Sequence, residues 1–150
     1  MTKQNEVELS ALTRQVSHMG GLVEQALDRS LVALLERDAG LARSVIEGDS
    51  EVDELENKVE EHCLEYLALR QPVARDLRLV CGVLKINSDL ERIGDQAVNI
   101  AENVIKLLPQ PPLKPLIDIP RMAEIAQQMT RDALDSFVKR DATLARDVLK

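Results

Sequence analysis

Aromatic side chains are almost missing from this chain of 150 residues, which has one tyrosine, one phenylalanine and no tryptophan. Its core must therefore consist of aliphatic side chains, alanine and methionine, which supply most of the 45% hydrophobic residues. This composition, together with 30% charged residues, is typical of packed helices and argues against a β-sandwich. The length predicts one domain, or one domain and part of another.

An excess of basic residues is also missing, because the formal net charge is -7. Proteins that bind duplex nucleic acid neutralise phosphates with lysine and arginine, so the acidic balance argues against a nucleic-acid partner. No apolar run reaches the ~18 residues of a membrane span, and the first residues lack the apolar stretch of a signal peptide. We therefore expect no direct insertion into a membrane.

Cysteine is scarce, and the two cysteines, Cys63 and Cys81, do not have the spacing of a metal-binding motif. The sequence predicts two buried, reduced thiols.

Three long stretches show helical periodicity, over about residues 5–36, 39–70 and 72–108. Asp38 is a plausible N-cap of the second helix, and Pro72 is suited to the first turn of the third. In the third stretch the apolar stripe is Ile86, Leu90, Ile93, Ala97, Ile100, Val104 and Leu107. Its register shifts near residues 82–86, where a bend is possible. The pattern predicts an all-α fold, a three-helix bundle of long amphipathic helices in an up-down-up order.

Five of the six prolines lie in residues 109–120, which we interpret as a linker because prolines end helices. The chain then divides into a complete three-helix unit at 1–108, this linker, and a partial second unit at 121–150 whose helix spans about 121–139. An internal repeat supports the division: residues 31–47 read LVALLERDAGLARSVIE and residues 134–150 read LDSFVKRDATLARDVLK. The chain therefore resembles one finished helical unit followed by the start of a copy.

Two strips of acidic residues could carry chemistry. Glu91, Asp95 and Glu102 share one face of the third helix, predicted to lie opposite the apolar stripe. A second strip lies on the second helix and consists of Asp49, Asp53, Glu56 and Glu60. Carboxylates four residues apart can share one cation, but a solvated polar face has the same pattern, and both interpretations stay open here.

Conventional catalytic motifs are missing. Neither His18 nor His62 has a carboxylate three residues before it, so the Glu-x-x-His pairs of di-iron oxidases are absent. The sequence also lacks a glycine-rich phosphate loop and a nucleophile elbow. We therefore predict no catalytic residues and no enzymatic activity. Arg70, Arg75 and Arg78 either pair with Asp76 and nearby glutamates or contact an anion or partner.

Four segments together resemble the PhoU family of regulators of bacterial phosphate uptake. They are MGGLVEQAL at 19–27, Asp49 with Asp53, LRQPVARDLR at 69–78, and LKINSDLERIGDQAVNIAE at 84–102. The resemblance implies tandem three-helix bundles that bind metal clusters at surface carboxylates. In this chain the implied metal ligands are Glu91, Asp95, Asp49 and Asp53, with iron, zinc, magnesium or manganese as the ion.

The resemblance further implies a cytoplasmic protein, held at the inner membrane only through partners. It would repress the phosphate regulon through contacts with the phosphate ABC transporter and a membrane sensor histidine kinase, and it would form a homodimer or larger oligomer. Family members usually extend further, so we expect either a truncated chain or a short homologue, whose residues 121–150 pack on the first bundle or on another chain. The alternatives are a carboxylate-rich metalloenzyme, such as a phosphatase or oxidase, and a purely structural helical adaptor.

Overall fold

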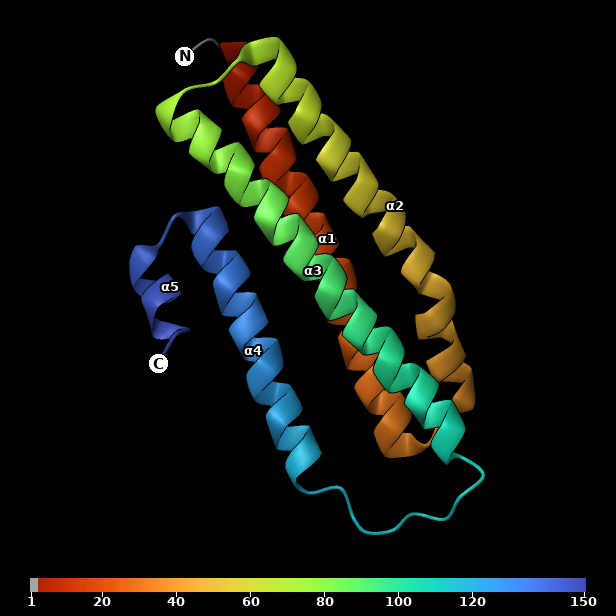
Figure 1. The fold of residues 1–150 in the computed structure, drawn as a ribbon. Helices are drawn as coiled ribbons and strands as arrows, with labels where there is room; N and C mark the ends of the chain where they lie inside the picture. Colours follow the sequence, from red (N-terminus) through yellow and green to blue (C-terminus); the bar gives the residue numbers. More distant parts are fainter. Residues whose placement is uncertain (1–2) are drawn as a thin grey trace.

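The computed structural model describes residues 3–150, which form five helices. They are α1 (Lys3–Glu36), α2 (Ala39–Arg70), α3 (Ala74–Leu107), α4 (Asp118–Lys139) and α5 (Ala142–Asp147). The first three helices are long, run in alternating directions and pack against one another in every pair, as Figure 1 shows. The predicted all-α, up-down-up three-helix bundle is confirmed.

The core runs along a seam in which α3 contributes residues at regular steps of three and four. These buried residues are Val80, Val83, Asn87, Leu90, Gly94, Ala97, Ala101 and Val104. The steps continue without interruption through residues 82–86, so the predicted shift of register there is wrong. The predicted stripe was also centred one position too early, because its isoleucines flank the seam and Leu107 is exposed. Asn87 and Gly94 are part of the buried seam, in place of Ile86 and Ile93.

Both connections within the bundle depend on residues with positive φ. Arg37 (φ 56°) ends α1, and Asp38 then caps α2 by accepting a hydrogen bond from the backbone N–H of Leu41 at 3.0 Å, as predicted. Gln71 (φ 46°) ends α2, and α3 begins at Ala74 rather than Pro72. Pro72 lies in the connection because Gln71, with its left-handed backbone conformation, ends α2 just before it.

The same corner recurs in the second copy of the repeat. Arg140 has φ 55°, and the Asp141 carboxylate accepts hydrogen bonds from two backbone N–H groups of α5. Alignment of Asp38 with Asp141 makes α4 the equivalent of α1 and α5 the equivalent of the first turns of α2. The structure begins α4 at Asp118, three residues before the predicted start, because Pro120 is tolerated in a first turn, whose N–H groups need no helical partner.

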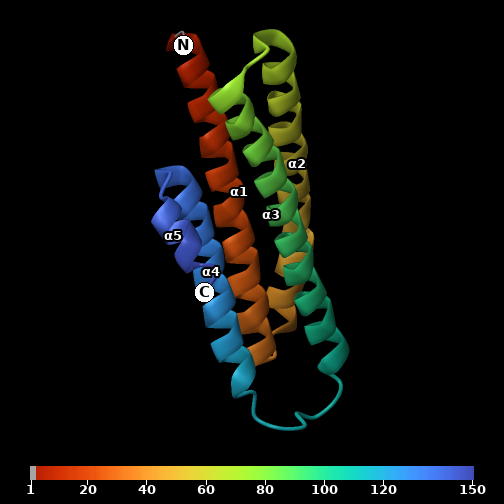
Figure 2. The ribbon, with the colours of Figure 1, turned by 60° about the vertical axis from the view of Figure 1, so that its left-hand side comes forward.

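Helix α4 lies alongside α1, as Figure 2 shows. The contact is close at Gly20, where a Cβ atom would lie 2.5 Å from Cδ1 of Leu134. Within residues 121–150, α4 therefore packs on the first bundle, one of the two expected arrangements, whereas α5 packs on α4. Much of α4 still faces solvent, since Met122, Ile125 and Met129 are 66%, 53% and 48% exposed.

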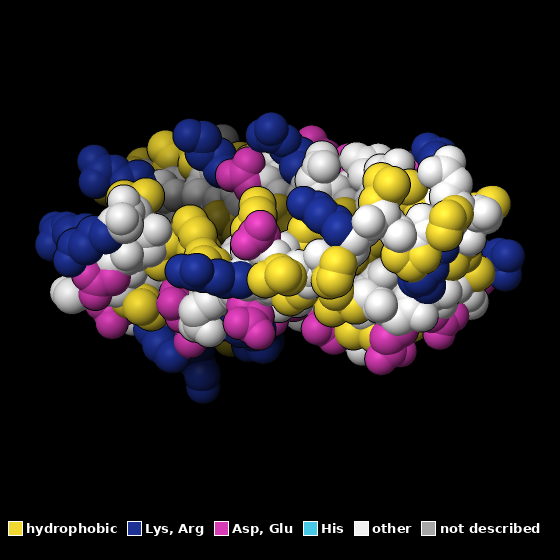
Figure 3. All heavy atoms as spheres, turned by 90° about the horizontal axis from the view of Figure 1, so that it is seen from below, with side chains coloured by type: hydrophobic (Ala, Val, Ile, Leu, Met, Phe, Trp, Pro, Cys, Tyr) yellow, Lys and Arg dark blue, Asp and Glu magenta, His cyan; other side chains and the backbone are white. Residues whose placement is uncertain are grey.

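Exposed hydrophobic side chains continue into the linker, where Leu113 is fully exposed and Ile117 largely so. Figure 3 views the molecule from the linker end and shows hydrophobic side chains open to solvent between charged ones. None of the five described helices combines the length and apolar character that a membrane crossing requires. Of the two cysteines, Cys63 is buried, but Cys81 is exposed on α3, so the prediction of two buried thiols is half wrong.

Candidate metal centre

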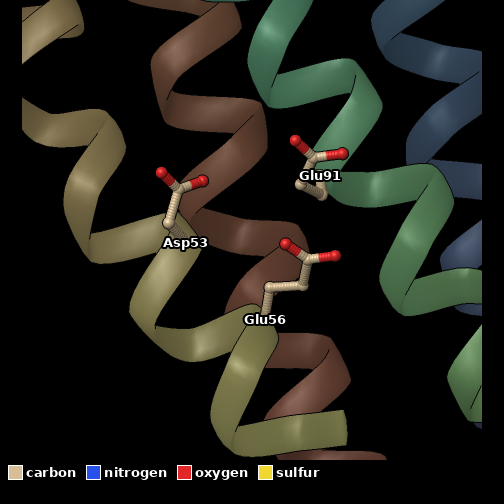
Figure 4. A group of neighbouring side chains, drawn as sticks. All are labelled: Asp53, Glu56 and Glu91. Atoms are coloured by element: carbon tan, nitrogen blue, oxygen red, sulfur yellow. The ribbon is translucent and has the colours of Figure 1, made fainter.

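Carboxylates from α2 and α3 meet in one group along the surface between the two helices. Asp53 and Glu56 of α2 and Glu91 of α3 each offer an oxygen, and these three oxygens lie within 4.8 Å of one another. Figure 4 shows the three carboxylates near one another, two from one helix and one from the other. Parts of the two acidic strips of the sequence therefore meet in one candidate site.

The place of Glu91 follows from the seam of α3. Glu91 comes four residues after the buried Asn87, which is about 40° around the helix. It therefore flanks the buried seam on the side of α2 rather than lying opposite the apolar residues, as the sequence had indicated. Gly94 brings α2 close one turn later: a Cβ there would lie 3.5 Å from Cγ1 of Val52 and 3.8 Å from Oδ1 of Asp49.

The four residues predicted as ligands occupy different parts of this group. Asp53 and Glu91 belong to the compact set. Asp49 adjoins it, because the charge of Asp53 acts on Asp49, and Asp95 adjoins it through its hydrogen bond with Glu91. Glu56 was part of the acidic strip but was not chosen as a ligand, and the structure places it in the compact set. Glu102 is exposed and lies outside that set.

The carboxylates of this group disfavour one another's charges. A hydrogen bond with the Asp95 carboxylate is the main cause that raises the pKa of Glu91 to about 7, and desolvation adds to it. Burial and then the charge of Asp53 raise the pKa values of Asp49 and Glu56. No ion pair within residues 3–150 joins any of these side chains to lysine or arginine. The group is thus an uncompensated negative surface that a cation would neutralise.

The raised pKa of Glu91 predicts that the metal-free protein loses stability as the pH rises. The pKa of this carboxyl is 4.5 for the free side chain and about 7 in the folded state. Between pH 4.5 and pH 7 the folded state therefore binds the proton more tightly than the unfolded state does. The stabilisation is complete below pH 4.5 and is lost as the pH rises through 7. In EDTA we expect Tm to fall by a few degrees from pH 5 to pH 8.

Glu91→Gln should flatten this dependence, whereas Glu102→Gln, which alters an exposed residue of the same helix, should not. Thermal denaturation followed by circular dichroism at both pH values checks the prediction. Equal slopes for the protein and its Glu91→Gln variant would show that the proton is held elsewhere.

The arginines between α2 and α3 have separate roles. The guanidinium of Arg70 pairs with the Glu8 carboxylate of α1, with contacts of 2.6 and 2.9 Å, and hydrogen bonds from Arg70 and then Gln4 lower the pKa of Glu8 to about 2. Arg75 and Arg78 instead line a broad hollow between α1, α3 and α4. The pairing interpretation holds for Arg70, but its partner is Glu8 rather than Asp76.

Comparisons with known proteins point to one family. A family model described as the PhoU domain matches residues 16–104 and 119–150. The chain is 45% identical over 143 residues to a phosphate-specific transport system accessory protein PhoU homolog of Aquifex aeolicus, covering 95% of this chain and 65% of that protein. It is 38% identical over 138 residues to the accessory protein PhoU of Escherichia coli K12, covering 92% of this chain and 57% of that one.

A crystal structure of PhoU from Pseudomonas aeruginosa matches the fold with a TM-score of 0.90 and 36% sequence identity. The match covers 95% of this chain and 68% of the other. This chain thus spans less than two thirds of the length of the two relatives from A. aeolicus and E. coli. The likeness extends over nearly the whole of the present chain, including both helices that carry the acidic group.

Proposed function

Because the chain belongs to the PhoU family, we propose that it is an accessory regulator of phosphate transport. The observation that carries this proposal is the 45% identity over 95% of the chain to a protein named for that role. We propose that it restrains expression of the phosphate regulon when phosphate is plentiful. It would do so through contacts with the phosphate ABC transporter and a membrane sensor histidine kinase, at the cytoplasmic side of the membrane and as a dimer or larger oligomer.

The proposal includes a metal ion at the carboxylate group between α2 and α3. Asp53, Glu56 and Glu91 would supply the nearest oxygens, and Asp49 with Asp95 would add negative charge around them. The fit rests on the three oxygens within 4.8 Å and on the raised pKa of Glu91, to which the hydrogen bond with Asp95, then desolvation, then the neighbouring negative charges contribute. A bound cation would hold α2 and α3 together and shape the surface offered to a partner, without turnover of a substrate.

The regulatory proposal is tested by deleting the gene in its host and measuring alkaline phosphatase activity in medium rich in phosphate. We expect phosphatase expression to rise at least several-fold in the deletion strain and to return to the wild-type level with a plasmid copy of this chain. An empty plasmid is the matched control. Repression that is unchanged by the deletion, or derepression that this chain leaves uncorrected, would contradict the proposal.

A further inference from the structure

Asn87 is a buried amide in a seam that is otherwise apolar or small. Its side chain is 3% exposed and occupies the core position between Val83 and Leu90 of α3. Its Nδ2 donates a hydrogen bond of 3.0 Å to the backbone oxygen of Glu56 in α2. Its Oδ1 has no hydrogen-bond partner among the described residues. A buried acceptor without a donor lowers stability, so an apolar residue would serve packing alone better.

The hydrogen bond to Glu56 places Asn87 next to the carboxylate group. Glu56, whose backbone oxygen accepts the bond, also belongs to the compact set with Asp53 and Glu91. Asn87 itself precedes Glu91 by one helical turn. The bond therefore connects the turn of α2 that carries Glu56 to the turn of α3 that leads into Glu91.

A connection at this place has a physical purpose. The carboxylates of α2 and α3 repel one another, which favours sliding or separation of the two helices before a cation binds. Apolar side chains in a long seam permit several axial offsets, whereas a single buried polar residue selects one at some cost in stability. A binding site gains affinity when its ligands are held in place in advance by groups behind them.

We propose that Asn87 is a positioning residue of the metal centre, which fixes the axial register of α2 and α3 so that Asp53, Glu56 and Glu91 face one cation. This inference rests on the proposed function, because it assumes that the carboxylate group binds metal. Asn87 does not supply a ligand in this scheme. It acts through the backbone of Glu56.

The test replaces Asn87 by leucine, which has the same branching but no polar atoms, in the full chain. We expect two effects of opposite sign. The Tm in EDTA rises by a few degrees, because an unsatisfied polar group is removed from the core. The Kd for Mn²⁺, measured by electron paramagnetic resonance of the free ion, increases at least tenfold. If Asn87 had only a structural role, its substitution would not raise Tm and weaken Mn²⁺ binding at the same time.

Val83→Ala is the matched control, because Val83 is fully buried one turn earlier in the same seam and is not a member of the carboxylate group. It should lower Tm and leave the Kd for Mn²⁺ unchanged. If leucine is too large to fold at position 87, Asn87→Ala removes the same bond with a smaller side chain and should also weaken binding at least tenfold.

The outcomes separate the two levels of the proposal. If Asn87→Leu binds Mn²⁺ with the wild-type Kd, the role of Asn87 is overturned and the metal centre stays intact. Where Asn87→Leu does not fold, the same result with Asn87→Ala overturns that role. Failure of the wild-type chain to bind Mn²⁺ more tightly than its Glu91→Ala, Asp95→Ala variant would overturn the metal centre and this inference with it, whereas the regulatory role would still be judged by the deletion strain.

Discussion

Replacing Glu91 and Asp95 together by alanine should weaken metal binding by roughly a hundredfold or more and leave the purified protein without bound metal. The two substitutions remove every carboxylate that α3 contributes to the group, so the remaining acidic residues all lie on one helix. Affinity for hard cations depends on the number of charged oxygen ligands and on their arrangement around the ion, and both are lost. The magnitude follows from the tenfold to hundredfold losses seen when residues merely supporting a metal ligand are removed.

The same double substitution should raise the stability of the metal-free protein at about pH 8, because it removes the ionised Glu91 carboxylate, whose charge Asp95 and desolvation disfavour. Wild-type protein should instead be more stable with metal than in EDTA, since a ligand that binds only the folded state stabilises it. Elemental analysis after purification and Mn²⁺ titration measure the binding, and thermal denaturation measures the stability.

The control for charge is a chain with Asp89→Ala and Glu102→Ala. Both residues are exposed on α3 and lie outside the compact group, and Asp89 faces Arg92 at 3.7 Å. This chain loses the same two negative charges and should retain the wild-type metal content. Equal metal content in the Glu91→Ala, Asp95→Ala chain and the wild type would show that the ion is held elsewhere or not at all. A site made only of carboxylate oxygens would favour magnesium or manganese over zinc among the predicted ions.

The helices of this chain were predictable because their apolar residues recur with a helical period, and all three predicted spans of the bundle agree with α1, α2 and α3 to within about two residues. The centre of the α3 seam was not predictable by the same means. Asn87 and Gly94 occupy core positions there, and a search for apolar residues passes over both. The apolar pattern then centres on the isoleucines beside them. As a result, Glu91 was predicted to lie opposite the buried seam, whereas it flanks it.

The carboxylate group was predictable only in part. The spacing of Asp49 with Asp53 and of Glu91 with Asp95 marks residues that share a helix face, since this depends on one helix alone. Which residue of α2 faces which residue of α3 depends on the axial offset between the helices, and no local pattern records that offset. Glu56 was therefore not chosen as a ligand, although it lies in the same acidic strip.

The internal repeat allows a sharp test of which face of α4 has a partner. Alignment of the two copies through Asp38 and Asp141 makes Met122 of α4 the equivalent of Met19 of α1. Met19 is fully buried between α1, α2 and α3, whereas Met122 is 66% exposed. The two positions carry the same side chain on equivalent helices, so they differ mainly in what covers them.

Met19→Ala should reduce the free energy of unfolding by about 2–5 kcal/mol, because it removes buried methylene and sulfur contacts and leaves a cavity in a core that has few large side chains. Met122→Ala should change it by less than about 0.5 kcal/mol, as is usual for exposed positions. Urea denaturation of both variants at low protein concentration checks the difference. A loss of stability in Met122→Ala that grows with protein concentration would instead show that a second copy of the chain covers this face of α4, because only an interface between chains makes stability depend on concentration.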